Sequence, residues 1–321
     1  MKAIIYHWWD NYNPIAFKNI RVPILPSIAT LRANNSYAPI YVLDCNKKMA
    51  NWGHFPRKLG FEVVPWKMSY ESYNQPDVEF IARLKDIFNF TRQISADEIV
   101  YCDSDVFWLK DPLPLFHSPD LFCSNRYNNG FFYFDKNSPA IYQFFELFAA
   151  IGLTCLNSPE IVQHITQKTK SAALDEKIVD YLFEIRPELV TRISPIEHAT
   201  FRDFLVKKIN FKDFKMLHCN GLMVENKFQR TYGNRQHSRG LVTIMFKEFY
   251  DAMKSVLDHF DLELIFNCDE LNYYVPKQVD LLNEDFVERL RSLNLDPSQN
   301  FHLKESFSQS FSSQTSTSDS G

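Results

Sequence analysis

The hydrophobic pattern of the first half of the chain alternates between short apolar runs and longer amphipathic segments. Three short runs are rich in β-branched and aromatic residues and predict buried strands: KAIIYHWW at 2–9, APIYVLDC at 38–45 and FEVVPW at 61–66. Segments of helical length separate them, such as residues 20–34. Residues 77–94 predict an amphipathic helix, because one face carries the apolar residues Phe80, Leu84, Ile87 and Phe88.

The strand predicted after this helix, EIVYC at 98–102, ends in two acidic residues. Side chains two apart in a strand point to the same face, so Asp103 and Asp105 converge, with Ser104 turned away. Residues 119–152 then predict a strand pair and a strongly apolar helix. This succession predicts an α/β fold with an open, mainly parallel sheet covered by helices. Ligands bind such sheets beyond the carboxyl ends of the strands, which is where the acidic pair lies.

The last third of the chain has a different pattern. Residues after about 235 are apolar with helical periodicity, whereas 307–321, FSQSFSSQTSTSDSG, contain too few apolar residues to offset the entropy of ordering. We therefore expect a core at 1–235, a helical extension of the same domain at 236–306 and a disordered Ser/Thr-rich tail at 307–321.

Composition narrows the class of protein. The 321 residues are 45% hydrophobic and 23% charged, as in globular proteins with a full core. With a net charge of −4, no basic surface stands out to suggest nucleic acid or an anionic membrane as the main partner, and a local basic pocket is still compatible with this charge. We find no secretory signal and no apolar run near the roughly 20 residues of a membrane span. Six scattered cysteines without a C-x-x-C pair fit reduced thiols, so we expect a cytoplasmic protein.

The acidic pair allows two interpretations. An isolated Asp-x-Asp most often caps a turn. Alternatively, Asp103 and Asp105 hold a divalent cation, for which carboxylate oxygens suit magnesium or manganese.

Several motifs in a fixed order carry a family resemblance. DSDVFWLKDPLPLF at 103–116, followed by NNGFFYF at 128–134, resembles the core of GT-A glycosyltransferases, the retaining nucleotide-sugar enzymes. The D-x-D-V-x-W-L-x-D-P motif at 103–112 is most similar to the nucleotide-diphospho-sugar transferases of family 77 and to the glycogenin-like family 8. LDEKIVDYLF at 174–183 resembles their acidic segment beside the donor sugar, and MLHCNGLMVENK at 216–227 resembles their His-x-x-Gly element. The resemblance covers roughly residues 1–230.

The resemblance implies a role for each matching residue. Asp103, Asp105 and His218 would bind the metal, and the imidazole favours Mn²⁺ over Mg²⁺. Asp175 and Glu176 would be the catalytic carboxylates. The residues implied to bind the nucleotide-sugar donor are His7, Trp8, Tyr12, Arg83, Lys85, Asp103, Ser104, Asn128, Asn129, Gly130, Gly221 and Lys227.

Each of these residues also has a simpler explanation. Asn-Gly is the strongest hairpin signal, so 128–130 could form a turn. A histidine between Leu217 and Cys219 could belong to the core, and the acids at 175 and 176 could stabilise the first turn of a helix. Arg83, Lys85 and Lys227 could be solvated, and the aromatic rings near the N-terminus could be core. The chain also departs from family 8: it has Asp-Glu in place of Asp-Gln and lacks the Lys-Pro-Trp ending, which makes the assignment of Lys227 looser.

The function expected from the resemblance is that of a metal-dependent retaining glycosyltransferase. It would move a sugar from a nucleotide-diphosphate donor, most simply a UDP-sugar, to a hydroxyl of a glycan, protein or small molecule. The sequence leaves open whether retention is covalent or proceeds by attack on the same face. Two alternatives are a phosphatase of the HAD type, which also has an acidic pair after a strand, and an inactive module that binds sugar nucleotides.

Overall fold

The computed structural model describes part of one compact unit of the chain. This unit contains Met1–Met223 and Val256–Glu263, and a second unit contains Val224–Ser255 and Leu264–Gly321. The described residues are 1–8, 24–35, 37–45, 52–69, 76–104, 106–111, 120–125, 128–169, 173–194, 198–200, 215–218, 256 and 259–260, all in the first unit. The expected helical extension and tail lie outside the described residues, apart from 256, 259 and 260, so these expectations stay predictions.

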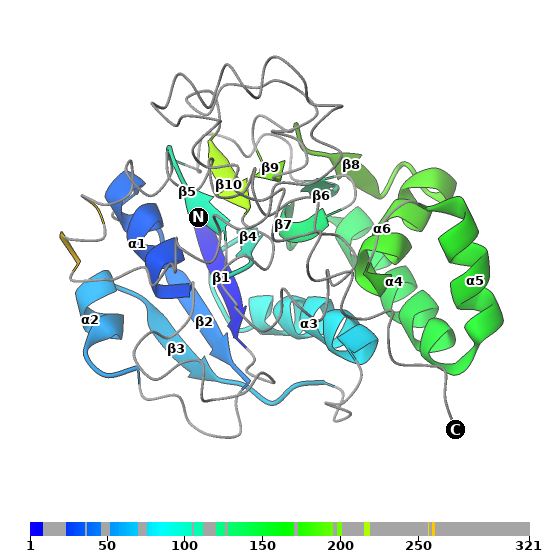
Figure 1. The fold of residues 1–321 in the computed structure, drawn as a ribbon, viewed down its shortest axis with the longest axis horizontal. Helices are drawn as coiled ribbons and strands as arrows, with labels where there is room; N and C mark the ends of the chain where they lie inside the picture. The colour runs from blue at the N-terminus through cyan, green and yellow to red at the C-terminus, as the bar shows by residue number, and fades with distance from the viewer. Residues whose placement is uncertain are drawn as a thin grey trace, which may run out of the picture. The chain divides into compact units, whose positions relative to one another are not determined.

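A mixed sheet of seven strands forms the centre of this unit. Its strands are β1 (Lys2–Trp8), β2 (Ile40–Asp44), β3 (Glu62–Pro65), β4 (Glu98–Cys102), β6 (Phe122–Asn125), β7 (Asn128–Asp135) and β8 (Val190–Arg192). They are ordered β3-β2-β1-β4-β7-β6-β8 (Figure 1). The first four run parallel, β7 is antiparallel to both β4 and β6, and β6 is parallel to β8. The prediction of an α/β fold with a mainly parallel sheet is confirmed.

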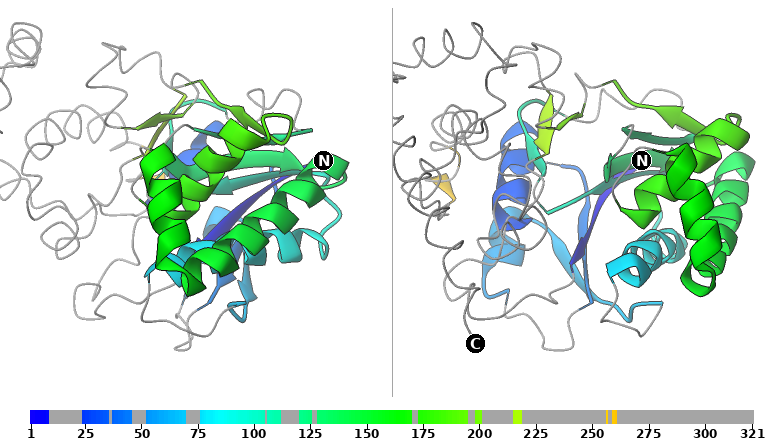
Figure 2. Two further views of the ribbon diagram at one scale, coloured as in Figure 1. Left: turned by 90° about the vertical axis from the view of Figure 1, so that its right-hand side faces the viewer. Right: turned by 45° about the vertical axis from the view of Figure 1, so that its right-hand side comes forward.

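Helices cover both faces of this sheet. They are α1 (Ile24–Asn34), α2 (Phe55–Leu59), α3 (Pro76–Thr91), α4 (Pro139–Asn157), α5 (Pro159–Lys168) and α6 (Leu174–Ile185). α1 and α2 lie on one face and α3 to α6 on the other (Figures 1 and 2). Side chains of β1 alternate between the two faces of the sheet and so pack against both helix layers. Ile4 and Tyr6 pack with residues of α1, whereas Ile5 packs with residues of α3. In α3, Leu84, Ile87 and Phe88 are buried, as their spacing predicts.

One described helix, α4, is long and apolar enough to cross a membrane by length and composition alone. It has 19 residues and a mean hydropathy of 1.4, which is closer to a span than the sequence analysis expects. In this structure its Phe144, Phe145 and Phe148 belong to the core, and Phe122 of β6 stacks on Phe144 with ring centroids 4.0 Å apart. Apolar core helices commonly meet the same criterion, so α4 has a packing role here.

A second, three-stranded sheet brings the strand at 216–218 next to the acidic motif at 103–105 in the fold. β5 (Val106–Trp108), β9 (Ala199–Thr200) and β10 (Met216–His218) are ordered β5-β10-β9. β10 is antiparallel to β5, and His218 pairs with Val106. Because β5 begins just after the acidic motif, this register places His218 beside the end of β4.

Candidate functional site

Asp103 and His218 form the centre of the candidate site. Asp103 directly follows β4, where its backbone N–H donates to the carbonyl of Gly130 in β7 at 2.7 Å. His218 Nε2 lies 3.7 Å from Asp103 Oδ2. Two ligand atoms that are each bound about 2.1 Å from one ion lie about 3 to 3.7 Å apart, so this pair fits a shared metal. The third predicted ligand, Asp105, lies outside the described residues.

The hydrogen bonds of Asn128 set the tautomer of His218. Asn128 Oδ1 accepts the backbone N–H of Gly130 at 2.8 Å and lies 2.8 Å from His218 Nδ1. An oxygen that accepts both bonds requires a proton on Nδ1, and a neutral imidazole then has its lone pair on Nε2. Nε2 is the nitrogen that faces Asp103. Asn128 therefore acts as the outer partner that orients metal-binding histidines in proteins.

Gly130 allows the strand to approach this pair closely. A Cβ atom at this position would lie 1.9 Å from His218 Cε1 and 2.8 Å from Asp103 Oδ2. Any larger residue would therefore occupy the space between the two groups. Residues 128–130 do not form the turn that the Asn-Gly signal suggests, since they begin β7, the antiparallel partner of β6, and Asn128 pairs with Asn125.

Arg83 connects the metal-site carboxylate to a second, buried carboxylate. From α3 it donates to Asp103 Oδ1 at 2.9 Å and to Asp175 Oδ2 at 2.8 Å. The hydroxyl of Tyr101 also donates to Asp103 Oδ1, and burial raises the pKa of Tyr101 well above its ordinary value, which keeps this donor protonated. Arg83 therefore lies within the site and is not a solvent-exposed surface residue of α3.

Asp175 is the most deeply buried acid of the site. It lies in the first turn of α6, fully buried, and Asn129 Nδ2 donates to its Oδ2 at 3.4 Å. Burial raises the pKa of the Asp175 carboxyl above its ordinary value, whereas the Arg83 guanidinium opposes this shift. Within the described part of the chain its Oδ1 has no hydrogen-bond partner. A buried polar atom of this kind is a natural contact for a polar ligand.

Glu176 has a different role from its neighbour. Its Oε2 accepts the backbone N–H of Ala173 at 3.2 Å, which caps the start of α6, and its Oε1 accepts from Asn128 Nδ2 at 3.4 Å. Glu176 thus supports Asn128 and, through it, His218. The interpretation as a first-turn acid fits Glu176 better than the catalytic one.

The remaining predicted donor residues lie in different surroundings. His7 lies with Cys45 and Asp86 on the α3 side of the sheet. Trp8 packs edge-on against Trp52 in the core, with ring centroids 6.1 Å apart, as the alternative for these aromatic rings expects. Lys85 is turned about 200° around α3 from Arg83. Ser104 adjoins Asp103, and both Lys85 and Ser104 are partly buried. Tyr12, Gly221 and Lys227 lie outside the described residues.

Sequence reasoning missed several contributors to this region. Tyr101 was expected only as a strand residue, and the fully buried His198, whose ring stacks on His218 at a centroid distance of 5.5 Å, was not considered. Asp86 had a usable signal, because it follows Arg83 by three residues and so shares its face of α3. His198 had no local signal, because β9 adjoins β10 only in the folded sheet.

No protein-family model and no curated protein matches this chain. Among solved structures it is similar to the glycosyltransferase GlyE of Streptococcus pneumoniae TIGR4, at 15% identity and a TM-score of 0.40, over 68% of this chain and 55% of that one. The apo form of GlyE is 13% identical with a TM-score of 0.46, over 79% of this chain and 64% of that one. The chain thus spans less than two thirds of GlyE.

Two other solved structures are galactosyltransferase LgtC in complex with donor and acceptor sugar analogues, and mouse xyloside xylosyltransferase 1. LgtC is 14% identical with a TM-score of 0.43, over 69% of this chain and 88% of that one. The mouse protein is 10% identical with a TM-score of 0.43, over 69% of this chain and 98% of that one. Likenesses of this size carry no argument about function, which has to come from the residues of the site.

Proposed function

We propose that this protein is a metal-dependent retaining glycosyltransferase that uses a nucleotide-diphosphate sugar, most simply a UDP-sugar. One observation carries the proposal. His218 presents the lone pair of Nε2 toward Asp103 Oδ2, in a tautomer imposed by Asn128, beside the buried carboxylate of Asp175. A metal site next to a buried carboxylate, at the carboxyl end of β4, suits transfer from a charged leaving group.

The charge of the site supports a cation. Asp103 and Asp175 share one guanidinium, that of Arg83, and Glu176 adds another negative charge beside Asn128, so the described groups repel a diphosphate unless positive charge is added. Asp103, Asp105 and His218 would hold Mn²⁺, since two carboxylates and an imidazole suit it. When bound, the ion supplies positive charge that neutralises the nucleoside diphosphate as it leaves. Arg83 adds a fixed charge at the same place.

Asp175 is the residue we assign to the donor sugar. Its Oδ2 is held by Arg83 and Asn129, which leaves Oδ1 for a sugar hydroxyl or the anomeric centre. A carboxylate at this position serves as the nucleophile in a covalent route or stabilises positive charge on the sugar ring in same-face attack. The geometry is equally compatible with both routes.

The test is a panel of nucleotide sugars incubated with Mn²⁺ and no acceptor, with release of free nucleotide as the readout. We expect slow hydrolysis of one donor and a Mn²⁺-dependent increase in melting temperature. Asp105→Asn and His218→Ala should lose both, because each removes a ligand. Asp97→Asn and His164→Ala are matched controls, since both residues are exposed.

The same experiment separates the alternatives. Phosphatase activity with a trapped aspartyl-phosphate would favour the HAD-type enzyme. Nucleotide binding without turnover across the panel would favour an inactive module. If the Asp105 and His218 variants kept the Mn²⁺ shift and normal turnover, the two aspartates would be turn residues and the proposal would fail.

A further inference from the structure

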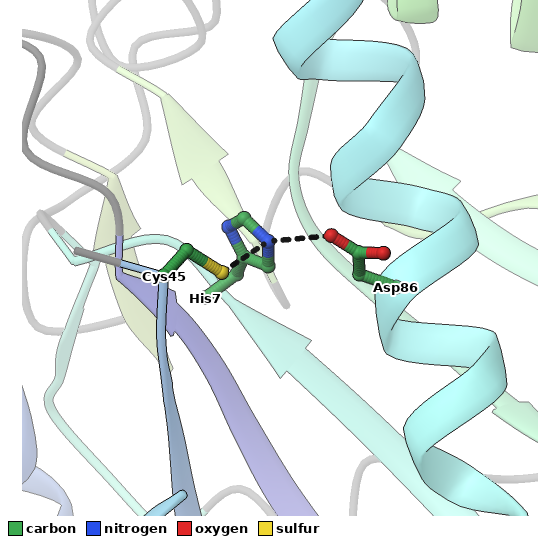
Figure 3. A group of neighbouring side chains, drawn as sticks. All are labelled: His7, Cys45 and Asp86. Atoms are coloured by element: carbon green, nitrogen blue, oxygen red, sulfur yellow. Dashed lines mark hydrogen bonds and ion pairs between the residues drawn. The ribbon is translucent and has the colours of Figure 1, made fainter. Parts of the chain in front are cut away.

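His7, Cys45 and Asp86 form a second cluster of potential metal ligands on the same face of the sheet. His7 lies near the end of β1, Cys45 directly follows β2, and Asp86 projects from the middle of α3. Figure 3 shows the three side chains pointing toward one another. His7 Nε2 lies 3.3 Å from Cys45 Sγ and 3.4 Å from Asp86 Oδ2, and the three ligand atoms all lie within 4.8 Å of one another.

Strand alternation explains why these groups meet. His7 follows Ile5 by two residues and Cys45 follows Leu43 by two, and both apolar residues belong to the core cluster on the α3 side. Parallel pairing keeps the two strand ends level, since the backbone N–H of Cys45 donates to the carbonyl of Trp8 at 2.8 Å. The fold therefore brings a thiol and an imidazole together above a helix that supplies a carboxylate.

Hydrogen bonding alone satisfies this cluster poorly. His7 Nε2 carries either one proton or one lone pair, yet two groups approach it. A proton would be divided between two acceptors, and a lone pair would face the lone pairs of Asp86. The 3.4 Å contact is also longer than an ordinary N–H···O hydrogen bond. A cation at the centre would be attracted to the imidazole lone pair, the thiolate and the carboxylate together.

The geometry and ligand types select the metal. We propose that His7, Cys45 and Asp86 bind a zinc ion at a site separate from the Asp103–His218 site. Ligands bound about 2.0 to 2.3 Å from a tetrahedral ion lie about 3.3 to 3.6 Å apart, which agrees with the two contacts of His7. Sulfur disfavours Mg²⁺ and Mn²⁺, and the mixed S, N and O set suits Zn²⁺. Three protein ligands leave a fourth position for water.

The surroundings hold the ligands in place. The backbone N–H of Ser69 donates to Asp86 Oδ1 at 3.0 Å, and the Ser69 hydroxyl donates to the same oxygen. This fixes the carboxylate with Oδ2 toward His7, as outer partners do at metal sites. The His7 and Asp86 side chains are 2% and 0% exposed, so the ion would be shielded from bulk solvent apart from the water in its fourth position. Binding would release the thiol proton of Cys45 to solvent, because zinc binds the thiolate.

The test uses cobalt and zinc on the full-length protein, with no donor present. Co²⁺ bound to a thiolate absorbs in the near ultraviolet through sulfur-to-metal charge transfer, and the Asp103–His218 site has no sulfur among its proposed ligands. We expect this band in wild type, its displacement by Zn²⁺, and its loss in Cys45→Ser. Metal analysis should find one zinc more per chain in wild type than in Cys45→Ser.

Two cysteine variants are matched controls. Cys155 in α4 is buried to the same degree as Cys45, at 4% exposure, and Cys219 follows the proposed ligand His218. Cys155→Ser and Cys219→Ser should keep the band and the zinc. Asp86→Asn keeps the size of the side chain and should weaken zinc binding by at least about tenfold.

Several results would overturn the proposal. Absence of the band in wild type would leave a hydrogen-bonded cluster without metal, and this outcome needs no variant. A band that survives Cys45→Ser, or disappears in Cys219→Ser alone, would assign the sulfur elsewhere. If Cys45→Ser fails to fold, as judged by circular dichroism, an unchanged zinc affinity in folded Asp86→Asn would equally exclude the site. None of these measurements depends on glycosyltransferase activity.

Discussion

Arg83 ties the proposed metal site to the proposed catalytic carboxylate at the level of single residues. One nitrogen of its guanidinium contacts Asp103 and the other contacts Asp175. A planar guanidinium fixes the angle between two carboxylates better than a lysine ammonium does. The separation of the two acids is therefore set by Arg83 without a ligand, which favours a preorganised site.

Asp175→Asn is the sharpest residue-scale prediction, because it separates activity from stability. Burial raises the pKa of the Asp175 carboxyl, and Asp103 adds to this effect. Relative to the unfolded chain, the fold therefore makes ionisation of Asp175 less favourable: the stabilising contribution of the protonated form is present below the unfolded pKa of about 3.9 and is lost as pH rises through the folded pKa. At pH 7 we expect Asp175→Asn to abolish donor hydrolysis and to raise stability by about 1 kcal/mol, or roughly 2 to 4 °C in melting temperature.

The pH dependence and a neighbouring acid provide the controls for this experiment. The gain in melting temperature should shrink when thermal unfolding is repeated near pH 4, where the wild-type carboxyl is protonated more often. Asp180 lies on the same helix but pairs with Arg192, so Asp180→Asn should lower the melting temperature. An Asp175→Asn protein that is less stable at pH 7, or that still turns over donor, contradicts the assignment.

At the scale of elements, the ends of three parallel strands build this face of the sheet. Ile5, Leu43 and Tyr101 belong to the core cluster that packs on α3, and each is followed two residues later by a polar group: His7, Cys45 and Asp103. The core thus determines which side chains face α3 at the edge of the sheet. Arg83 and Asp86, three residues apart, approach them from adjacent positions on that helix.

The start of β7 has to approach the metal site closely, and a substitution at Gly130 tests this requirement. Alanine at position 130 would place its Cβ 1.9 Å from His218 Cε1, and moving the ring aside would disturb the contact between its Nδ1 and Asn128. We expect Gly130→Ala to lose the Mn²⁺-dependent thermal shift and about 1 to 3 kcal/mol of unfolding free energy. Chemical denaturation and a thermal-shift titration with Mn²⁺ measure the two effects.

Gly152 is the matched glycine control for that variant. It lies in α4, where an added Cβ would meet Ile81 Cγ2 at 2.9 Å, away from the metal site. Gly152→Ala is expected to change stability alone and to keep the Mn²⁺ shift. Retention of the shift in Gly130→Ala would show that His218 does not bind the ion in the position described.

The elements were predictable where local pattern and tertiary packing agree. β4 coincides with the EIVYC run, and α3 has its apolar face where the 3.6-residue period places it. The Asn-Gly signal was misleading, because Asn128, Asn129 and Gly130 belong to β7 and do not form a turn. Asn128 and Asn129 instead bond to Glu176 and Asp175 of α6, a contact that local turn chemistry does not encode.

The site was predictable only where a motif carried it. Asp103, Asp175 and His218 came from motif resemblance, and the structure places them in one region. The Arg83–Asp175 contact joins residues 92 positions apart, and the His7–Asp86 contact joins residues 79 apart. Such pairs depend on strand order and on the rotation of α3 against the sheet, which periodicity does not determine.

At the scale of the whole described unit, the candidate site lies where the two sheets meet. β4 leads into β5 through the acidic motif, and β10 returns beside β5 with His218. The described groups that face the proposed donor come from the end of β4 and from β7, β10, α3 and α6. The donor half of the reaction should therefore depend on this unit.

Deleting residues 307–321 tests that conclusion on the intact remainder of the chain. The segment is rich in serine and threonine, and such a composition provides little apolar area with which to form a wall of a binding site. We expect the shortened protein to keep donor hydrolysis and the Mn²⁺-dependent thermal shift. A chain in which the order of these fifteen residues is shuffled is the matched control, because it keeps length and charge. If the shortened and the shuffled protein both lose donor binding, the tail contributes specific contacts and the proposed donor site is incomplete without it.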